Sequence, residues 1–569
     1  MSQSIPEQLT FLYGAETAVS LTTRLEAILN RFQTEHPELA VGVDNGRFNE
    51  QDAILITYGD MVQIADTAPL AALGDFLKQW LDGIVSVIHF LPFFPYSSDD
   101  GCSVIDYWAV NPDLGTWEDV DETGRHFRLM FDAVINHISA QSDWFQGFLR
   151  DDEIFQDYFT TVEPGTDLSQ VFRPRTLPLL TEVETSSGAK QVWTTFSADQ
   201  IDLNFANPDV LLKIIELLLF YVEHGAEFIR LDAIGFMWKK IGTNCLHLPQ
   251  THRAIQLMRS ALNEVAPHVA LITETNVPHA DNISYFGNGR NEAQLVYNFS
   301  LPPLTLHAFH TGNAETLSRW ADTLTLPSNE VTFFNFLASH DGIGLTPARG
   351  ILAETAVNRI AERVKALDGH VSYKNNPDGS KSAYELNINY LDALGDPDAL
   401  DEPTELIARR FLASQAIMLA LRGVPGIYFH SLFGSRGWPE GVKVSGRNRT
   451  INREKLQRER LETELADETS LRHHIFNGYV DLLRQRTTHP AFHPNGGQEI
   501  LALHPALFAL RRVSPSGTAV LLCLHNVSNE MVSVALPDGQ FTDLLTRQEV
   551  AGGVGIRPYQ ILWLQESPR

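Results

Sequence analysis

The chain has 569 residues, of which 44% are hydrophobic and 20% are charged, and this composition is typical of a folded protein of enzyme size rather than of a disordered chain. Its formal net charge of −27 argues against nucleic acid or an anionic membrane as a partner, because long-range repulsion opposes both. The three cysteines, Cys102, Cys245 and Cys523, are too few and too scattered for a disulfide framework or a cysteine-based zinc site, which indicates a reducing compartment.

The amino-terminal segment predicts neither export nor membrane insertion. MSQSIPEQLTFLYG lacks a basic stretch followed by an apolar core, and residues 1–50 are expected to form a mostly helical extension. The most apolar later run, 416–429, is too short to span a bilayer and contains Arg422. We therefore expect a cytoplasmic protein that spans no membrane.

Apolar, β-branched runs recur along the chain, and most are followed by an amphipathic stretch of helical length. One such stretch, 211–225, has the periodicity of a helix packed on a sheet and ends at a glycine. This alternation predicts the α/β class and a (β/α)8 TIM barrel, whose active site lies at the carboxyl ends of its strands. The eight predicted strands are DAILITYGD (52–60), VSVIHFLPF (85–93), LMFDAVINH (129–137), EFIRLDA (227–233), ALITETN (270–276), AQLVYNF (293–299), FFNFLASHD (333–341) and VPGIYFHS (424–431).

Two long intervals interrupt the alternation and predict insertions over the barrel mouth, where insertions usually shape a substrate site. One contains the turn-rich RPRTLPLLT, and the other contains Asn-Asn-Pro-Asp-Gly, a strong turn sequence. Short strands near the carboxyl terminus predict a β domain. The predicted division is a helical N-terminal extension at 1–50, barrel segments at 51–137, 202–341 and 401–495, inserted domains B and B′ at 138–201 and 342–400, and a C-terminal β domain at 496–569.

Charged and amide side chains stand where four of the predicted strands end. Arg230 and Asp232 interrupt a run that otherwise has the pattern of a buried strand, and buried charges need partners. A structural ion pair would explain these two residues as well as a functional site does. Taken together, the strand-end residues favour convergence on one barrel mouth; they are Asn136 and His137, Arg230 and Asp232, Glu274 and Asn276, and His340 and Asp341.

Three carboxylates at one mouth suit the chemistry of a retaining glycosidase. One carboxylate attacks the anomeric carbon while a second, held protonated, donates to the leaving oxygen, and the two lie about 5 Å apart. Arg230 would keep Asp232 ionised and oriented, and Glu274, at the end of an apolar run, is placed to have the raised pKa that an acid needs. Asp341 can then stabilise the positive charge of the transition state.

The strand-end motifs resemble those of the α-amylase superfamily, glycoside hydrolase family 13. The matching stretches, in the family's order, are DAVINH (132–137), RLDAIGF (230–236), ITETN (272–276) and FLASHD (336–341). The resemblance implies Asp232 as the nucleophile, Glu274 as the acid/base and Asp341 as the transition-state stabiliser. It also implies that Arg230, His137 and His340 surround the glucosyl unit.

Within that superfamily the chain is similar to the sucrose-phosphorylase-like subfamily. The resemblance implies that Asp99 and Arg453 clamp the far hydroxyl of glucose, although a salt bridge that braces the barrel would use the same pair. It further implies substrate contacts from Phe196, Gln200, Asn276, Tyr384 and Glu385. The supporting stretches are SSDDGCSVIDY (97–107), FRPRTLPLLT (172–181), WTTFSADQIDLN (193–204), GTNCLHL (242–248), FSLPPLTLHA (299–308), SHDGIG (339–344) and INREK (451–455).

Members of this subfamily are phosphorylases, in which inorganic phosphate rather than water attacks the glucosyl ester. The product implied is α-D-glucose 1-phosphate with retained configuration. Such a site needs cations for phosphate and a fit that excludes water. By the resemblance Arg175, in FRPRT, and Tyr384, in SAYELN, bind the phosphate, whereas Arg173 is compatible with an ordinary surface loop.

The acceptor side, meaning the part of the site that would bind the group joined to glucose, departs from that of sucrose phosphorylases proper. Asn276 replaces a histidine, Phe236 a tyrosine and Cys102 an aromatic residue, while Lys381, Ser382 and Glu385 replace a leucine, an aspartate and a glutamine. The chain instead resembles the branch that acts on glucosylglycerate, glucosylglycerol or sucrose 6′-phosphate. An anionic acceptor would need a cation, for which Lys381 and Lys374 are the evident loop candidates. The strong acidity suits recycling of a neutral compatible solute, so glucosylglycerol is the predicted substrate and the two anionic glucosides are its alternatives.

Two rival functions remain open at this point. A hydrolase or transglucosylase on the same barrel would not require phosphate, and a catalytically silent accessory subunit would be expected to lack the nucleophile or to carry a membrane segment. We expect no cofactor and no metal, and the partners expected are an α-glucoside and phosphate, while oligomeric state cannot be read. The remaining histidines have the scatter of ordinary surface or packing residues: His247, His252, His279, His473 and His474.

Overall fold

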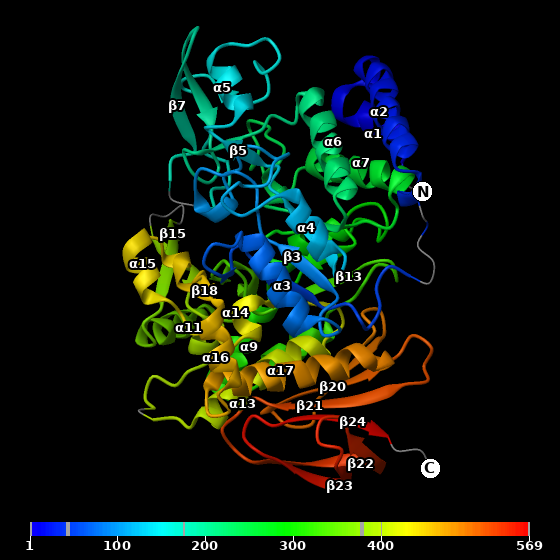
Figure 1. The fold of residues 1–569 in the computed structure, drawn as a ribbon, viewed down its shortest axis with the longest axis vertical. Coiled ribbons are helices and arrows are strands. Elements are labelled where there is room, and N and C mark those ends of the chain that lie inside the picture. The colour runs from blue at the N-terminus through cyan, green and yellow to red at the C-terminus, as the bar shows by residue number, and fades with distance from the viewer. Residues whose placement is uncertain are drawn as a thin grey trace.

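The computed structural model describes residues 3–40, 42, 46–174, 177–375, 380–399 and 401–566. Its centre is a closed barrel of parallel strands in the order β1-β17-β13-β12-β11-β10-β4-β3, which confirms the predicted (β/α)8 barrel and its eight strands (Figure 1). The strands are shorter than the apolar runs because each run continues into the mouth. They are β1 (Ile54–Thr57), β3 (Val87–Phe90), β4 (Arg128–Ala133), β10 (Ala226–Leu231), β11 (Ala270–Thr273), β12 (Leu295–Tyr297), β13 (Thr332–Phe336) and β17 (Val424–Tyr428).

Helices cover the outside of the barrel. The helix predicted at 211–225 is α6 (Pro208–Glu223), which begins where the Asn207 side chain accepts from the Asp209 backbone N–H, and Gly225 follows it with a φ of 84°. Ten of its sixteen residues are buried, so α6 is held by packing rather than by propensity alone. The other covering helices are α3 (Pro69–Leu81), α4 (Trp117–Gly124), α7 (Pro249–Val265), α9 (Leu301–Thr311), α10 (Glu315–Asp322), α13 (Thr404–Ala420) and α17 (Leu471–Thr488).

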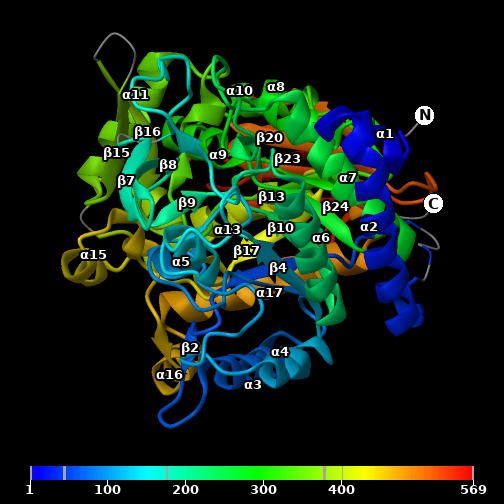
Figure 2. The same cartoon turned by 90° about the horizontal axis from the view of Figure 1, so that it is seen from above.

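The amino-terminal extension is helical and lies against the barrel helices. In α1 (Ile5–Tyr13) and α2 (Ala15–Glu35), Leu9, Leu21, Leu25 and Leu29 are buried at helical spacing. Both views place the two helices beside α6 and α7 (Figures 1 and 2). Within the described residues no helix combines the length and the apolar character needed to cross a membrane.

The two intervals predicted as insertions form small sheets above the carboxyl ends of the barrel strands. The domain boundaries at 138–201 and 342–400 remain predictions. Three antiparallel strands, in the order β14-β16-β15, form the part that flanks the site. The strong turn sequence predicted between β15 and β16 spans 375–379, and its residues 376–379 lie outside the described residues. The first interval holds β5 (His137–Ser139), α5 (Asp143–Leu149), β6 (Thr161–Val162), β7 (Leu180–Thr185), β8 (Gly188–Trp193) and β9 (Gln200–Asp202); the second holds β14 (Ile343–Gly344), α11 (Glu354–Ala366), β15 (His370–Asn375), β16 (Lys381–Asn387) and α12 (Tyr390–Ala393).

The chain ends in a six-stranded antiparallel sheet that abuts the opposite end of the barrel, beneath α13 and α17 (Figure 1). From this sheet, Arg512 donates to the Ala420 carbonyl at 2.6 Å, and Gln498 Oε1 accepts from the Arg422 backbone N–H at 2.7 Å, both just before β17 begins. This sheet therefore lies at the amino-terminal ends of the barrel strands, away from the mouth. Its strands are β19 (Gly497–Leu501), β20 (Leu507–Val513), β21 (Val520–Asn526), β22 (Val532–Asp543), β23 (Glu549–Ile556) and β24 (Ile561–Glu566); the remaining short elements of the chain are β2 (Val62–Gln63), α8 (His279–Ile283), α14 (Phe429–Leu432), α15 (Pro439–Ser445), β18 (Leu456–Gln457) and α16 (Arg458–Ala466).

Gly426 marks a place where the barrel interior has no spare volume. A Cβ atom there would collide with the ring of Phe334, which is fully buried and packs 4.4 Å from Tyr297. We expect Gly426→Ala to lower the free energy of unfolding by about 1–3 kcal/mol, because overpacking forces neighbours off their rotamers. Urea unfolding followed by fluorescence measures this. Gly553→Ala, where the added methyl meets only open space and one carbonyl at 4.0 Å, is the matched control, and an equal loss in both variants would refute the argument.

Candidate active site

Seven of the eight polar residues predicted at the strand ends line one pocket at the carboxyl end of the barrel, whereas the buried Asn136 is not among its lining residues. Arg453 lines an adjoining, more exposed pocket, which we call the outer pocket, and Arg175 lies outside the described residues. Asp99, Gln200, Tyr384 and Glu385 line both pockets. The predicted site residues that line the inner pocket are Asp99, His137, Phe196, Gln200, Arg230, Asp232, Glu274, Asn276, His340, Asp341, Tyr384 and Glu385.

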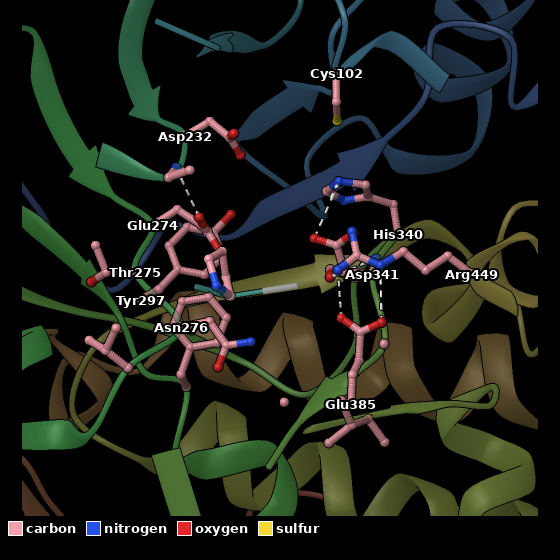
Figure 3. A pocket seen from close by; sticks show the side chains of 18 of the residues that line it. Cys102, Asp232, Glu274, Thr275, Asn276, Tyr297, His340, Asp341, Glu385 and Arg449 are labelled. Atoms are coloured by element: carbon pink, nitrogen blue, oxygen red, sulfur yellow. Dashed lines mark hydrogen bonds and ion pairs between the residues drawn. The ribbon is translucent and has the colours of Figure 1, made fainter. Parts of the chain in front are cut away.

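Asp232 and Glu274 extend from neighbouring strands into that inner pocket. Leu231 and Thr273 are register partners in the parallel pair β10 and β11, and each carboxylate residue comes next in the chain. The Glu274 backbone N–H donates to the Leu231 carbonyl at 3.2 Å. Adjacent strands lie about 4.8 Å apart, which suits the separation of about 5 Å between the two carboxyl groups of a retaining enzyme. Figure 3 shows both side chains at one cavity.

The environment of Glu274 favours its protonated form. Burial raises the pKa of this carboxyl to about 7; Arg230 opposes the rise, and the carboxylates of Asp232 and Asp341 add to it. Its Oε2 accepts from the Ala233 backbone N–H at 3.1 Å, which fixes the orientation of the side chain. A carboxyl group that is half protonated near neutral pH can act as both a proton donor and a proton acceptor.

Asp232 is held by a buried network beneath it. Arg230 donates to Asp232 Oδ1 at 2.9 Å and also to Asp132, which His89 contacts at 2.7 Å from the other side. The guanidinium of Arg230 also lies 5.4 Å from the ring centre of Tyr297. Burial raises the pKa of Asp232, and Arg230 lowers it without fully cancelling that effect. The prediction that Arg230 orients Asp232 fits this geometry, but the arginine is shared with Asp132.

Asp341 is strongly held in its ionised form. Burial would raise its pKa, but Arg449, His340 and Arg453 together hold that pKa well below the usual range. Arg449 Nη1 donates to Asp341 Oδ1 at 2.6 Å, and Asn452 Nδ2 donates to the Asp341 carbonyl at 3.3 Å. Burial lowers the pKa of His340 to about 4, so this imidazole is neutral at physiological pH. A fixed negative charge at this point suits stabilisation of a positive sugar ring.

His137 and Gln200 share one acceptor at the pocket wall. His137 Nε2 lies 3.0 Å from the Cys102 carbonyl oxygen, and Gln200 Nε2 donates to the same oxygen at 3.2 Å. The ring of Phe196 lies 5.3 Å from that of His137. Burial lowers the pKa of His137, and both ring nitrogens have protein partners, since Nδ1 also lies 3.2 Å from Asn136 Nδ2.

The predicted pairing of Arg453 with Asp99 is looser than expected. The two side chains approach to 3.7 Å, while Arg453 Nη1 donates to the neighbouring Asp100 at 2.5 Å. Both acidic residues adopt positive φ values, 57° and 49°, so the backbone turns sharply enough to present them to one guanidinium. The sequence could not distinguish the two, because they are adjacent and chemically identical.

Two residues of the acceptor side, Asn276 and Glu385, are fixed by contacts within the protein. A Cβ atom on Gly344 would lie 2.6 Å from Asn276 Oδ1, so the asparagine amide packs directly on this glycine. Glu385, in β16, accepts from Arg449 Nε at 3.0 Å and from Nη2 at 2.6 Å. A forked pair of this kind fixes both groups in one plane.

Sequence reasoning missed several residues that the fold brings to the site. Arg449 and Tyr297 line the inner pocket, as does His247, which had the pattern of an ordinary histidine. Arg449 stands four residues before Arg453 and just ahead of the INREK stretch. Its closeness to that stretch was the signal in the sequence that could have identified it as a site residue. The two predicted loop cations, Lys374 and Lys381, are among the lining residues of neither pocket.

The ammonium group of Lys239 lies beside Asn136, the asparagine at the end of the third predicted strand. Lys239 Nζ lies 2.6 Å from Asp202 and donates to Asn136 Oδ1 at 3.0 Å. Asp202 also accepts from the Thr195 backbone N–H and hydroxyl, so its charge is fully engaged. Across the described ranges of the chain, no three histidine, cysteine, aspartate or glutamate side chains come together as a metal site.

The comparisons with known proteins agree with this geometry. The family described as "Alpha amylase, catalytic domain" matches residues 75–346. The glucosylglycerate phosphorylase of Spirochaeta thermophila is 50% identical over 98% of this chain and 97% of its own, and that of Allomeiothermus silvanus is 50% identical over 99% and 98%. The glucosylglycerol phosphorylase of Marinobacter adhaerens is 28% identical over 72% of this chain and 83% of its own. The crystal structure of sucrose 6F-phosphate phosphorylase from Thermoanaerobacter thermosaccharolyticum superposes with a TM-score of 0.72, at 24% identity, over 84% of this chain and 94% of that one.

Proposed function

Because the chain belongs to the α-amylase family, we propose that it is a glucosylglycerate phosphorylase, which converts an α-glucoside of glycerate and inorganic phosphate into α-D-glucose 1-phosphate and glycerate. The similarity of 50% to two phosphorylases of that name, over nearly the whole chain, supports this substrate. It favours the anionic alternative over glucosylglycerol, whose phosphorylase is 28% identical. The overall acidity that favoured a neutral solute is a property of the whole surface rather than of the acceptor side.

The first half-reaction uses the two facing carboxyl groups. Asp232 attacks the anomeric carbon and forms a covalent ester as the bond from that carbon to the glyceryl oxygen breaks. Glu274 transfers its proton to the departing oxygen, so that glycerate leaves with a neutral hydroxyl group. Asp341 faces the positive charge that develops on the ring, and His137 and His340 line the pocket beside the sugar.

The second half-reaction replaces glycerate by phosphate on the same face of the sugar. The ionised Glu274 accepts the proton of the attacking phosphate oxygen while the ester bond to Asp232 breaks. Two inversions at the anomeric carbon give net retention, so the product is the α-phosphate. Tyr384 and Arg175 are the residues we propose for binding phosphate at this stage.

One observation carries the assignment of a retaining glucoside enzyme: Asp232 and Glu274 follow a register pair on adjacent strands and line one pocket. It also argues against a silent accessory subunit, because the nucleophile, the acid/base and the stabilising Asp341 are all present. A hydrolase or transglucosylase would use the same three carboxylates. The dependence on phosphate therefore decides between these activities.

We expect glucosylglycerate to give stoichiometric glucose 1-phosphate in phosphate buffer and at least about tenfold less total turnover when phosphate is omitted. The panel should include glucosylglycerol, sucrose and sucrose 6′-phosphate, and we expect kcat/KM for glucosylglycerate to exceed each by tenfold or more, equivalent to about 1.4 kcal/mol of discrimination. Coupled assay of glucose 1-phosphate alongside free glucose measures both products. Release of free glucose at the same rate without phosphate would show a hydrolase instead.

A further inference from the structure

Arg449 connects the transition-state carboxylate to the hairpin that borders the acceptor side. Its guanidinium donates to Asp341 through Nη1 and to Glu385 through Nε and Nη2, at 2.6, 3.0 and 2.6 Å (Figure 3). Glu385 lies beside Tyr384 in β16, so a single side chain ties that hairpin to the catalytic carboxylates. Three of its five N–H groups are used in these bonds, and 25% of its side chain is exposed.

Among the described residues that line the inner pocket, negative charge exceeds positive charge, which opposes an anionic ligand. Its lining includes two arginines, and one of them, Arg230, is buried and paired with Asp132 and Asp232 beneath the sugar site. The other is Arg449. The carboxylates that line the same pocket are Asp99, Asp232, Glu274, Asp341 and Glu385. Coulomb repulsion at such short range would strongly disfavour a carboxylate or phosphate that lacked a cation of its own.

The position of Arg449 matches the path of the acceptor. It lines both pockets, whereas Arg230 lines the inner one, and exposed side chains such as Leu177 and Tyr373 show that the outer pocket opens toward solvent. The glucosyl group stays on Asp232 while the acceptor leaves or enters, so the acceptor passes between the sugar and this opening. Arg449 therefore lies beside the moving acceptor rather than beneath the sugar.

In a double displacement the departing and the incoming acceptor occupy the same face of the sugar. If glycerate and phosphate are the two acceptors, as in the function proposed above, both bring negative charge to one place beside the carboxylates of Asp341 and Glu274. One cation beside the sugar can then attract both, in addition to the Arg175 proposed above for phosphate. Arg449 suits this role because its carboxylate neighbours keep the pKa of its guanidinium well above the ordinary value, so it remains charged.

We propose that Arg449 determines the preference of this site for anionic acceptors, and that Glu385 orients its guanidinium through the forked pair. This inference rests on the proposed function for the identity of the acceptors. Lys374 and Lys381, the loop cations suggested by the sequence, are not among the lining residues of either pocket, so they are not the source of this charge. Glu385 has a second effect, because its own negative charge reduces the attraction that Arg449 exerts on the acceptor.

The test is the partition of the glucosyl-enzyme between two acceptors of nearly equal size. α-Glucosyl fluoride supplies the glucosyl group without an anionic organic leaving group, and equimolar D-glycerate and glycerol then compete for it. Because both products come from one intermediate, their ratio is independent of any effect on its formation. For Arg449→Gln we expect the ratio of glycerate to glycerol products to fall at least about tenfold, with a parallel fall in the ratio of phosphate to water products.

Glu385→Gln keeps the shape of the pair and removes its negative charge, so we expect the ratio of glycerate to glycerol products to rise by about twofold or more. Lys443→Gln, on exposed α15, makes the same change in net charge as Arg449→Gln without lining either pocket and should leave the ratio unchanged. The proposal is overturned if Arg449→Gln leaves both ratios within twofold of wild type, or if Glu385→Gln lowers the ratio of glycerate to glycerol products. A wild-type enzyme that prefers glycerol would instead refute the proposed substrate, and the ratio of phosphate to water products would still test Arg449.

Discussion

Asp232→Asn is expected to abolish glucose 1-phosphate formation, with a loss of about 10⁴-fold or more in kcat. The amide has nearly the same shape as the carboxylate and can still accept from Arg230, so the pocket should remain intact. It cannot form the covalent ester, however, and both half-reactions pass through that ester. Single-turnover assays with glucosylglycerate, together with mass spectrometry of the trapped intermediate, measure the loss directly.

Asp113→Asn makes the same chemical change at an exposed position outside the pocket and should keep wild-type activity. Far-UV circular dichroism of both variants separates a chemical defect from unfolding. Activity of Asp232→Asn within tenfold of wild type, with no deamidated protein in the sample, would show that another group is the nucleophile.

Glu274→Gln should lower kcat/KM for glucosylglycerate by about 10²–10⁴-fold, since the glyceryl oxygen is a poor leaving group without a proton. α-Glucosyl fluoride needs no such proton, so the variant should still form the glucosyl-enzyme from this donor at a rate within about tenfold of wild type. A comparable loss with both donors would assign Glu274 a binding role instead of an acid role.

The pH dependence provides a second test of the same group. Glu274 has a pKa of about 7 and must be protonated to donate, so kcat/KM for glucosylglycerate should fall as the pH rises through about 7. This alkaline limb should be missing for the fluoride donor and in Glu274→Gln. Fixed-time assays from pH 5 to pH 9 at constant ionic strength would measure this decrease in kcat/KM. A limb that is identical for both donors would have to come from another group.

The barrel could be predicted from the sequence because its signal is local and repeated. Each buried parallel strand is a short apolar run, and the polar residues that follow it, such as Asp232 and Glu274, must lie at one end of a closed sheet. The residues that the sequence missed depend instead on how distant loops fold back. Arg449 meets Glu385 from 64 positions away, and no periodicity in either segment indicates that contact.

The acceptor side was the least predictable part for the same reason. Lys374 and Lys381 stand near Tyr384 in the sequence, but the register places both at the turn end of the β15–β16 pair, beyond a register shift, and neither lysine lines a pocket. The chain also gives no local signal for choosing Asp100 over Asp99 as the closer partner of Arg453. Substrate choice depends on such contacts, and the similarity to known phosphorylases favours the anionic alternative over the neutral glucoside.

The terminal sheet fastens the barrel at the end remote from the mouth, through hydrogen bonds of Arg512 and Gln498 with backbone groups ahead of β17. Rigidity is thus supplied at the base, while the loops that we propose to select the acceptor belong to separate small sheets at the rim. Residues at the rim can therefore be exchanged during evolution to accept new glucosides. Such exchanges leave intact the packing at the base of the barrel, which keeps Asp232, Glu274 and Asp341 aligned.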